Sequence, residues 1–381
     1  MKVLVRNAVY MPVLKWKQGE YTALGTLPSA DQEHILPLVV VPPAGDFDPE
    51  AGQPLEPAEH IKRFGPRLFD HWGRRPIFVD ALHVDDERHR SVSPEHPLAA
   101  LLGRARTQGA QACPATSLQR SATYQAVVAR FLQKHPDAPA CLRISAVELE
   151  DTQLVDNIEA FLSEMKLSPE RVVLLVDFEG DEAPPDDDFV EVLLERLNHL
   201  PHLHRWWLVA LAMTSFPERL KLQVGECGRY PRSDWSIYER LLACGERLLR
   251  APIFGDYALE YPDYRPVGRA TPRARLRYST KLEYLVENGT STKKPHGYAA
   301  IHPVAEALVK KTDFAGAHYS NGDRFISQLA TRTRKSGTAW QWRWATTEHH
   351  LRLVVGQLRT LLGVAEPARI PEPEPEPSLP L

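Results

Sequence analysis

Residues 172–178 read Val172-Val173-Leu174-Leu175-Val176-Asp177-Phe178. This run is short, apolar and rich in β-branched residues, which is typical of a strand that is buried in a parallel sheet. Seven other runs share its character: Met11 to Lys15, Ile35 to Val41, Pro76 to Leu82, Ala112 to Thr116, Cys141 to Ser145, Trp206 to Thr214 and Pro252 to Ala258. Between them lie segments such as 121–134, 151–165 and 188–200, whose apolar residues recur three and four apart and predict helices.

Eight strands that alternate with helices favour closure into a (β/α)8 TIM-type barrel. The alternative is an open, doubly wound sheet, which uses the same alternation. No G-x-G-x-x-G turn follows any of the runs, which argues against a dinucleotide site without affecting the barrel. We therefore predict an α/β fold with the barrel strands and their connecting helices in residues 1–264.

The segment 265–345 is predicted to be a basic α+β elaboration near the barrel mouth. It holds strand-like runs at 276–278 and 284–286, an Asn288-Gly289 turn signal and a helical stretch near 299–310. The alternation Trp340-Gln341-Trp342-Arg343-Trp344 predicts a further, half-buried strand.

The last part of the chain predicts one helix and a tail. Residues 346–366 carry Leu351, Val354, Val355 and Leu358 on one face, which predicts the final outer helix of the barrel. The Pro/Glu-rich segment 367–381 predicts a disordered, solvated tail.

Charge is distributed unevenly along the chain. From Arg265 to Arg343 there are fifteen Lys and Arg against five Asp and Glu, so with a formal net charge of -3 the rest of the chain carries -13. Opposite potentials favour docking of the basic segment beside or across the barrel mouth. The four cysteines form no C-x-x-C pair, and no apolar run is long enough to span a bilayer. Arg6 and Asn7 stand where a signal peptide needs apolar residues, so we expect a cytoplasmic protein.

A series of short motifs runs from Tyr10 to about Leu362, beginning with Tyr10-Met11-Pro12-Val13-Leu14-Lys15 and Gly19-Glu20. The later motifs are Pro37 to Pro43, Phe78-Val79-Asp80, Ser215-Phe216-Pro217, Phe254-Gly255-Asp256-Tyr257, Arg277-Tyr278, Gly322-Asp323 and His349-His350-Leu351. In these motifs and their order the chain resembles the Beta protein family of bacteria and their phages. Val41 stands where members often carry a glutamate, so any role of that carboxylate is absent here. The resemblance implies an association with mobile elements and phage–host conflict, and it supplies no mechanism.

Charged residues at the carboxyl ends of barrel strands converge on one face, so they are functional candidates. The predicted catalytic group is Lys15, Asp80, Arg143, Asp177 and Asp256. Lys15 and Arg143 would bind an anion or phosphate, and the carboxylates would act as a general base or hold a divalent metal, a possible cofactor. A Schiff base on Lys15 is a further alternative. The alternative is a purely structural role, in which a ring of internal ion pairs closes the barrel mouth and no substrate binds.

Further residues would complete a composite site. The predicted ligand-binding residues are Glu20, Arg277, Tyr278, Asp323 and His350, although a histidine with structural partners is the simpler reading of His350. Arg332, Arg334, Lys335 and Arg343 lie among aromatic residues, which suits single-stranded nucleic acid. The alternative is a solvated basic surface over a tryptophan core.

Two functions remain open at this stage. The first is an enzyme or effector, possibly hydrolytic, that acts on a phosphate-bearing ligand, nucleotide or nucleic acid at the carboxyl face. The second is a non-catalytic recognition or scaffold protein whose basic segment binds nucleic acid or a protein partner from a defence operon, away from membranes. The fold does not choose between them.

Overall fold

The structure is a computed structural model that describes residues 7–364 except 49, 51, 55, 86–94, 181–182, 265–271 and 294. The predicted Pro/Glu tail, 367–381, lies outside the described residues. Eight strands form the main sheet: β1 (Val13–Lys15), β2 (Leu38–Val40), β5 (Pro76–Asp80), β6 (Gln111–Ser117), β7 (Ala140–Ser145), β8 (Val172–Asp177), β9 (Leu208–Met213) and β11 (Ile253–Asp256). Each lies within or overlaps one of the predicted runs.

The sheet is parallel and nearly closed. Its order is β1-β2-β5-β6-β7-β8-β9-β11, and every pairing within it is parallel. Tyr10, just before β1, forms a parallel bridge with Phe254 of β11. The amide of Met11 donates to the carbonyl of Phe254 at 2.7 Å, which joins the two edges. The prediction of an α/β fold with eight parallel strands is confirmed, and the sheet is curled almost into a barrel.

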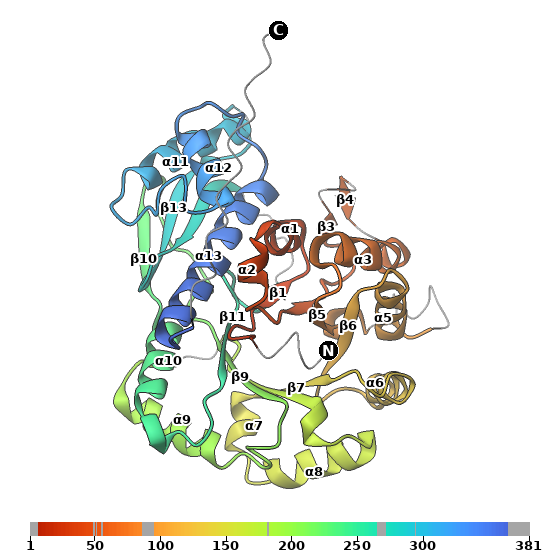
Figure 1. Cartoon of the computed structure of the whole chain (residues 1–381). Helices are drawn as coiled ribbons and strands as arrows, with labels where there is room; N and C mark the ends of the chain where they lie inside the picture. The colour runs from red at the N-terminus through yellow and green to blue at the C-terminus, as the bar shows by residue number, and fades with distance from the viewer. Residues whose placement is uncertain are drawn as a thin grey trace.

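Helices surround this sheet (Figure 1). They are α1 (Gln18–Thr26), α2 (Ser29–Gln32), α3 (Pro57–Trp72), α5 (Pro97–Thr107), α6 (Ala122–Lys134), α7 (Ala146–Glu150), α8 (Leu154–Met165), α9 (Asp187–Asn198) and α10 (Ser233–Ala243). Helix α6 shows why they form where they do: the Ser121 hydroxyl accepts from the Tyr124 amide and caps the first turn. Val128 and Leu132, four apart, are then buried in the core. A two-stranded ribbon, β3 (Phe47–Asp48) and β4 (Gln53–Pro54), follows β2.

A second, antiparallel sheet has the order β10-β13-β12. Its strands are β10 (Cys227–Pro231), β12 (Arg273–Ser279) and β13 (Glu283–Ser291), and α11 (Ile301–Val309) and α12 (Asn321–Ala330) pack on it over a separate apolar cluster. β10 comes from the chain between β9 and β11, so residues before 265 also contribute to this sheet.

Two local predictions in this region are wrong. Asn288 and Gly289 lie inside β13, and the hairpin turn falls at 280–282 instead. A glycine is needed at 289 because a Cβ there would overlap Val304 of α11. Trp340 to Trp344 are helical, since they begin α13 (Ala339–Leu361), which opens with a capping box between Thr338 and Gln341.

Helix α13 connects the two apolar clusters. Leu351, Val354, Val355 and Leu358 belong to the core of the barrel. Trp342 and Ala345 belong to the cluster under the second sheet. In Figure 1 this helix runs between the second sheet and the barrel strands. Within the described residues, no helix is long and apolar enough to cross a membrane.

Candidate functional site

Three groups of polar side chains gather at the carboxyl ends of the barrel strands. In the first, Arg143 of β7 lies between two carboxylates. Its Nη1 donates to Asp80 Oδ2 at 2.6 Å and its Nη2 to Asp177 Oδ2 at 2.7 Å. Arg120 Nη2 donates to the same oxygen of Asp80 at 2.7 Å and to Oδ1 at 3.0 Å, and the Tyr257 hydroxyl donates to Asp177 at 2.8 Å. These contacts are internal ion pairs of the kind expected if the strand-end charges have a purely structural role.

The electrostatics of this group are those of paired, buried charges. Asp80 is fully buried and Asp177 nearly so. Burial alone would raise the pKa of Asp80, but the guanidinium groups of Arg120 and Arg143 outweigh it and hold the pKa below its ordinary value. The carboxylates are therefore occupied by arginines, which leaves little reason for them to serve as a general base. Among the described residues, no three His, Cys, Asp or Glu side chains are grouped to hold a metal ion.

Lys15 lies apart from these residues, in the second group. Its Nζ donates to the backbone carbonyl of Asp263 at 2.6 Å and sits 4.7 Å from the centre of the Tyr264 ring. Only 9% of Lys15 is exposed. Burial lowers its pKa from 10.5 to about 8, with Glu260 acting in the opposite direction. Lys15 therefore lies at the predicted carboxyl face, but its contacts form a network separate from that of Asp80 and Arg143.

Lys15 lines a cavity of about 260 Å³ between the barrel and the second sheet. Three more cations line it, namely Lys17, Arg275 and Arg277, together with the acidic residues Glu218, Glu260 and Asp263. Lys17 forms an ion pair with Asp46 at 2.9 Å, and Arg277 pairs with Glu260. The cavity therefore combines the end of β1 with two alternate residues of β12.

Some of the charged side chains in this group form ion pairs and others do not. Glu260 also pairs with Arg343, which in turn contacts Glu20 at 3.2 Å. Burial would raise the pKa of Glu260, but Arg277, Arg343 and the lysines lower it to about 2. Arg275 donates to Asn288 Oδ1 at 2.9 Å. Within the described part of the chain, neither Lys15 nor Arg275 forms an ion pair with a carboxylate, so the cavity keeps positive charge available for a ligand.

The third group surrounds Asp256. His350 Nε2 lies 2.9 Å from Asp256 Oδ2, and His350 Nδ1 lies 2.6 Å from the Ser279 hydroxyl. The Tyr10 hydroxyl donates to the other oxygen of Asp256. A Ser-His-Asp order is the pattern of a nucleophilic triad, but Asp256 and His350 are fully buried and Ser279 is 1% exposed. None of the cavities described in this article is lined by them, so this group ties α13 to β11 and β12.

Four of the five predicted ligand-binding residues do not line the cavity. Tyr278 donates to Asp323 at 2.7 Å and stacks on His349, whose Nδ1 lies 2.8 Å from Asp323. His350 belongs to the Asp256 group. These side chains have hydrogen-bond partners inside the protein, and their role as ligand contacts stays a prediction. Arg277 lines the cavity, whereas Glu20 contacts Arg343, which does not line it.

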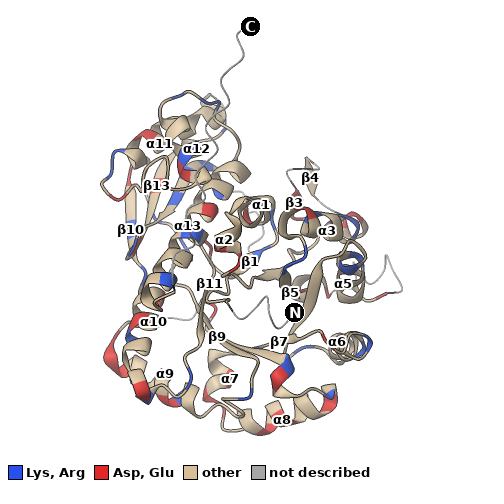
Figure 2. Ribbon diagram, viewed as in Figure 1, with Lys and Arg blue, Asp and Glu red and all other residues tan. Residues whose placement is uncertain are grey.

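The predicted nucleic-acid contacts are only partly free. Arg343 is engaged by Glu20 and Glu260, and Arg332 pairs with Glu306 at 3.0 Å. Arg334 lies over the Phe325 ring and Lys335 is exposed. Figure 2 shows the acidic residues concentrated on α9 and α10 of the barrel, and basic residues in α13 and beside β1. Lys294 of this basic segment lies outside the described residues.

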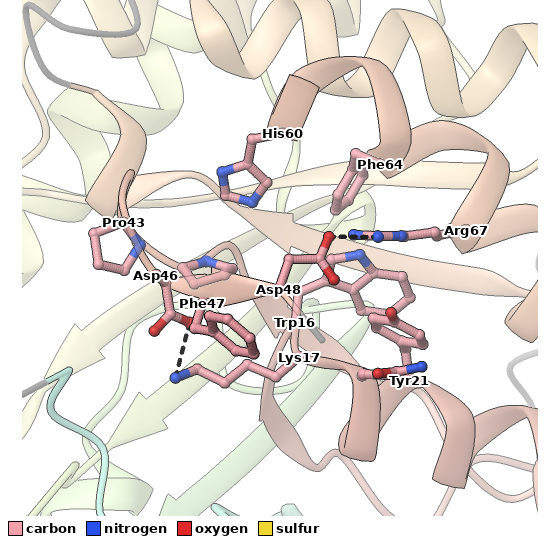
Figure 3. Close-up of a pocket in the computed structure, with 12 residues that line it drawn as sticks. Trp16, Lys17, Tyr21, Pro43, Asp46, Phe47, Asp48, His60, Phe64 and Arg67 are labelled. Carbon is pink, nitrogen blue, oxygen red and sulfur yellow. Dashed lines mark hydrogen bonds and ion pairs between the residues drawn. The ribbon is translucent and has the colours of Figure 1, made fainter. Parts of the chain in front are cut away.

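A second, smaller pocket adjoins the cavity through Lys17 (Figure 3). It measures about 30 Å³, enough for water only. Aromatic rings of Trp16, Phe47 and Phe64 surround it, and Arg67 pairs with Asp48 at its edge. It belongs to the packing of the β3–β4 ribbon rather than to a ligand site.

Several residues of these groups were not predicted. Arg120, Tyr257, Glu260 and Arg275 each lie a few residues beyond a strand end or on β12. The first three follow barrel strands by one to four residues, so a search that included the loops after the strands would have found them. Arg275 could not be found in this way, because its position depends on how the second sheet docks.

Fold and site define a barrel-like α/β protein with a cationic cavity at the carboxyl face. The sequence model of the family described as Beta protein matches residues 10–356, and the chain belongs to this family. No curated protein matches the chain. A crystal structure of a DUF72 family protein from Enterococcus faecalis V583 is similar at 11% identity and a TM-score of 0.30, over 68% of this chain and 100% of that chain.

Proposed function

We propose that this Beta-family protein binds a phosphate-bearing ligand in the cavity lined by Lys15, Lys17, Arg275 and Arg277. Four cations line the cavity together with the acidic residues Glu218, Glu260 and Asp263. The observation that carries the proposal is that two of these cations, Lys15 and Arg275, have no carboxylate partner among the described residues. A buried cation without a counter-ion costs free energy, and a bound anion would remove that cost. Arginine and lysine are also the side chains best suited to phosphate oxygens.

The proposal is one of binding rather than hydrolysis. Asp80 and Asp177, which a hydrolytic mechanism would use, are paired with Arg120, Arg143 and Tyr257. A Schiff base on Lys15 has weaker support than anion binding, because the other cations of the cavity are not needed for it. Lys15 nevertheless has the lowered pKa that such chemistry requires.

Binding of inorganic phosphate, measured by isothermal titration calorimetry at low salt, tests the proposal. We expect Lys15→Met to weaken phosphate binding by about tenfold or more, since one charge-assisted contact is lost. Lys62→Met is the matched control, because Lys62 lies on α3 with 67% of its side chain exposed and should leave binding unchanged. Absence of phosphate and sulfate binding by the wild type at low salt would refute the proposal.

The role in phage–host conflict that the family resemblance implies is also a proposal. It predicts that cells expressing the protein differ from cells without it in the plating efficiency of some phages. Lys15→Met should remove that difference if ligand binding is the input, and Lys62→Met should keep it. Equal plating with and without the protein across a broad phage panel would count against this role.

Nucleic acid is a second candidate ligand, favoured by the exposed run around Arg334 and Lys335. A hollow of about 560 Å³ beside it is lined by Arg324, Phe325 and Trp344. Replacement of Arg332, Arg334 and Lys335 by alanine should flatten the dependence of log affinity on log salt, by up to about 0.7 per contact for a single strand. An unchanged slope would assign any oligonucleotide binding elsewhere.

A further inference from the structure

Another cavity, larger than those described above, adjoins the Lys15 cavity at the barrel mouth. It measures about 590 Å³ and lies among the loops after β8 and β9 and the start of α10. Four residues line both cavities, namely Phe216, Pro217, Glu218 and Tyr261. The two spaces therefore adjoin along the segment after β9, and together they are called the groove below. Sites for drug-sized ligands measure about 300–1,000 Å³, so the groove has room for much more than a phosphate.

The two ends of the groove differ in chemistry. Lys15, Arg275 and Arg277 line the first end, whereas Thr214, Ser215, Ser233 and Asp234 line the second. Asp234 is 1% exposed, and the Tyr284 hydroxyl donates to it at 3.0 Å. Ser215 donates to the other oxygen of Asp234, so both oxygens of this carboxylate already accept hydrogen bonds. The second end therefore offers mainly the hydroxyl groups of Thr214 and Ser233 to a ligand.

Acidic charge also marks the junction. Glu218 lies where the two cavities meet, and Asp234 lies beyond it. Glu218 pairs with Arg219 at 3.9 Å, which offsets part of its charge. A chain of phosphates that extended from the Lys15 end would still approach both carboxylates, so this arrangement favours a ligand with a single terminal phosphate and an uncharged body.

An aromatic ring stands at the same junction. Tyr261 is half-buried, and its hydroxyl donates to the carbonyl of Gly180 at 3.3 Å. A Cβ at position 180 would overlap the Tyr261 ring, so the glycine fixes how closely the ring lies on the loop after β8. A held aromatic ring is a stacking surface for a planar base.

We propose that the groove takes a nucleoside monophosphate, with its phosphate at the Lys15 end and its sugar and base at the Asp234 end beside Tyr261. This inference rests on the proposed function, since it extends the phosphate site into the adjoining cavity. It goes beyond that function by naming the ligand class and by assigning a specificity role to Tyr261 and Glu218.

The test compares inorganic phosphate, ribose 5-phosphate and the four ribonucleoside monophosphates by calorimetry. We expect at least one monophosphate to bind about tenfold or more tightly than inorganic phosphate, because stacking adds to the phosphate contact. Nucleoside triphosphates should bind more weakly than that monophosphate. If phosphate binds but no nucleotide binds more tightly, this inference fails and the proposed function stands; if nothing binds, the proposed function fails.

Two variants separate the ends of the groove. Tyr261→Leu keeps a side chain over Gly180 and should weaken nucleotide binding by about tenfold while leaving inorganic phosphate unchanged. Lys15→Met should weaken both. Glu218→Gln, at a side chain that is 43% exposed and tolerant of change, should narrow the preference for monophosphate over triphosphate. An equal loss of phosphate and nucleotide binding in Tyr261→Leu would overturn the stacking role.

Discussion

At the scale of single residues, burial of the charged Lys15 side chain lowers the stability of the fold by an amount that depends on pH. Its pKa is about 8 in the folded protein against an ordinary value of 10.5, so the unfolded chain holds the proton more tightly. Between these two values the unfolded state binds more protons, and stability of the wild type rises with pH by up to about 1.4 kcal/mol per unit. Below about pH 8 the full cost of the buried ammonium is present.

Lys15→Met removes this titration. The free energy of unfolding of the variant should therefore exceed that of wild type by the largest amount near pH 7. This difference should shrink as pH rises toward 10. Urea unfolding of both proteins at several pH values measures it, because the other titrating groups are shared and cancel. A difference that stays constant across this range would show that Lys15 is not desolvated.

Lys15 also makes anion binding depend on pH. Sulfate keeps its charge across the neutral and basic range, so it reports on the protein alone. We expect sulfate affinity to fall as pH rises through about 8, where Lys15 loses its proton, and to be flat there in Lys15→Met. The same fall in the variant would mean that another group controls binding.

Arg143 differs from Lys15 in that it has carboxylate partners, since it neutralises two buried carboxylates. Arg143→Met should destabilise the fold by about 3–5 kcal/mol in denaturant titrations at pH 7, since Asp80 and Asp177 lose a shared partner. Asp80 keeps Arg120, so adding Asp177→Asn to the variant should restore part of the loss. The gap to wild type should also narrow as pH falls below 3.8, because the lowered pKa of Asp80 contributes stability that is lost as pH falls through its folded value.

At the scale of elements, α12 and α13 pack unusually closely at Gly322. A Cβ at this position would overlap the carbonyl of Ala345 on α13, which is backbone and cannot move aside. Gly322→Ala should therefore lower stability by about 1–3 kcal/mol, despite the better helix propensity of alanine. Thermal unfolding measures the change.

Gly356 on α13 is the matched control, because a Cβ there meets nothing within 4 Å. Gly356→Ala should raise stability by up to about 1 kcal/mol through helix propensity alone. If both substitutions stabilise, the two helices are not as close as the structure has them.

The elements also show what sequence reasoning could and could not reach. The eight barrel strands were predictable because a strand buried on both faces leaves a continuous apolar run, as in Val172–Asp177. The start of α13 was misread because tryptophans at 340, 342 and 344 alternate like a strand, although Thr338 and Gln341 already carried the capping-box signal. Asn288 was misread because an Asn-Gly pair marks a turn only where no neighbour demands the glycine, and here Val304 does.

The candidate site was predictable only by location. Strand ends gave Lys15, Asp80, Arg143, Asp177 and Asp256, but not which of them would meet. Partners for these residues come from loops and from β12, which is distant in sequence, so pairing depends on docking geometry that periodicity does not encode. Arg277 reaches the cavity and Tyr278 does not because neighbours on a strand point to opposite faces.

At the scale of the whole molecule, α13 belongs to both apolar clusters and carries the contact between His350 and Asp256. Arg232, beside β10, adds a further tie, since it donates to the Thr280 carbonyl and to Gln357 of α13. Barrel and second sheet thus share one long helix and several buried polar contacts. Neither part can lose the helix without exposing part of its own core.

This sharing predicts that the barrel and the second sheet unfold together. Differential scanning calorimetry of the wild type should show one transition whose van't Hoff and calorimetric enthalpies agree. His350→Ala leaves the Asp256 carboxylate with Tyr10 but without its imidazole partner, and should lower the transition temperature. His318→Ala is the control, at an exposed histidine outside all three polar groups, and it should shift the transition much less. Two separate transitions in the wild type would show that α13 does not couple the two parts, whatever the effect of His350.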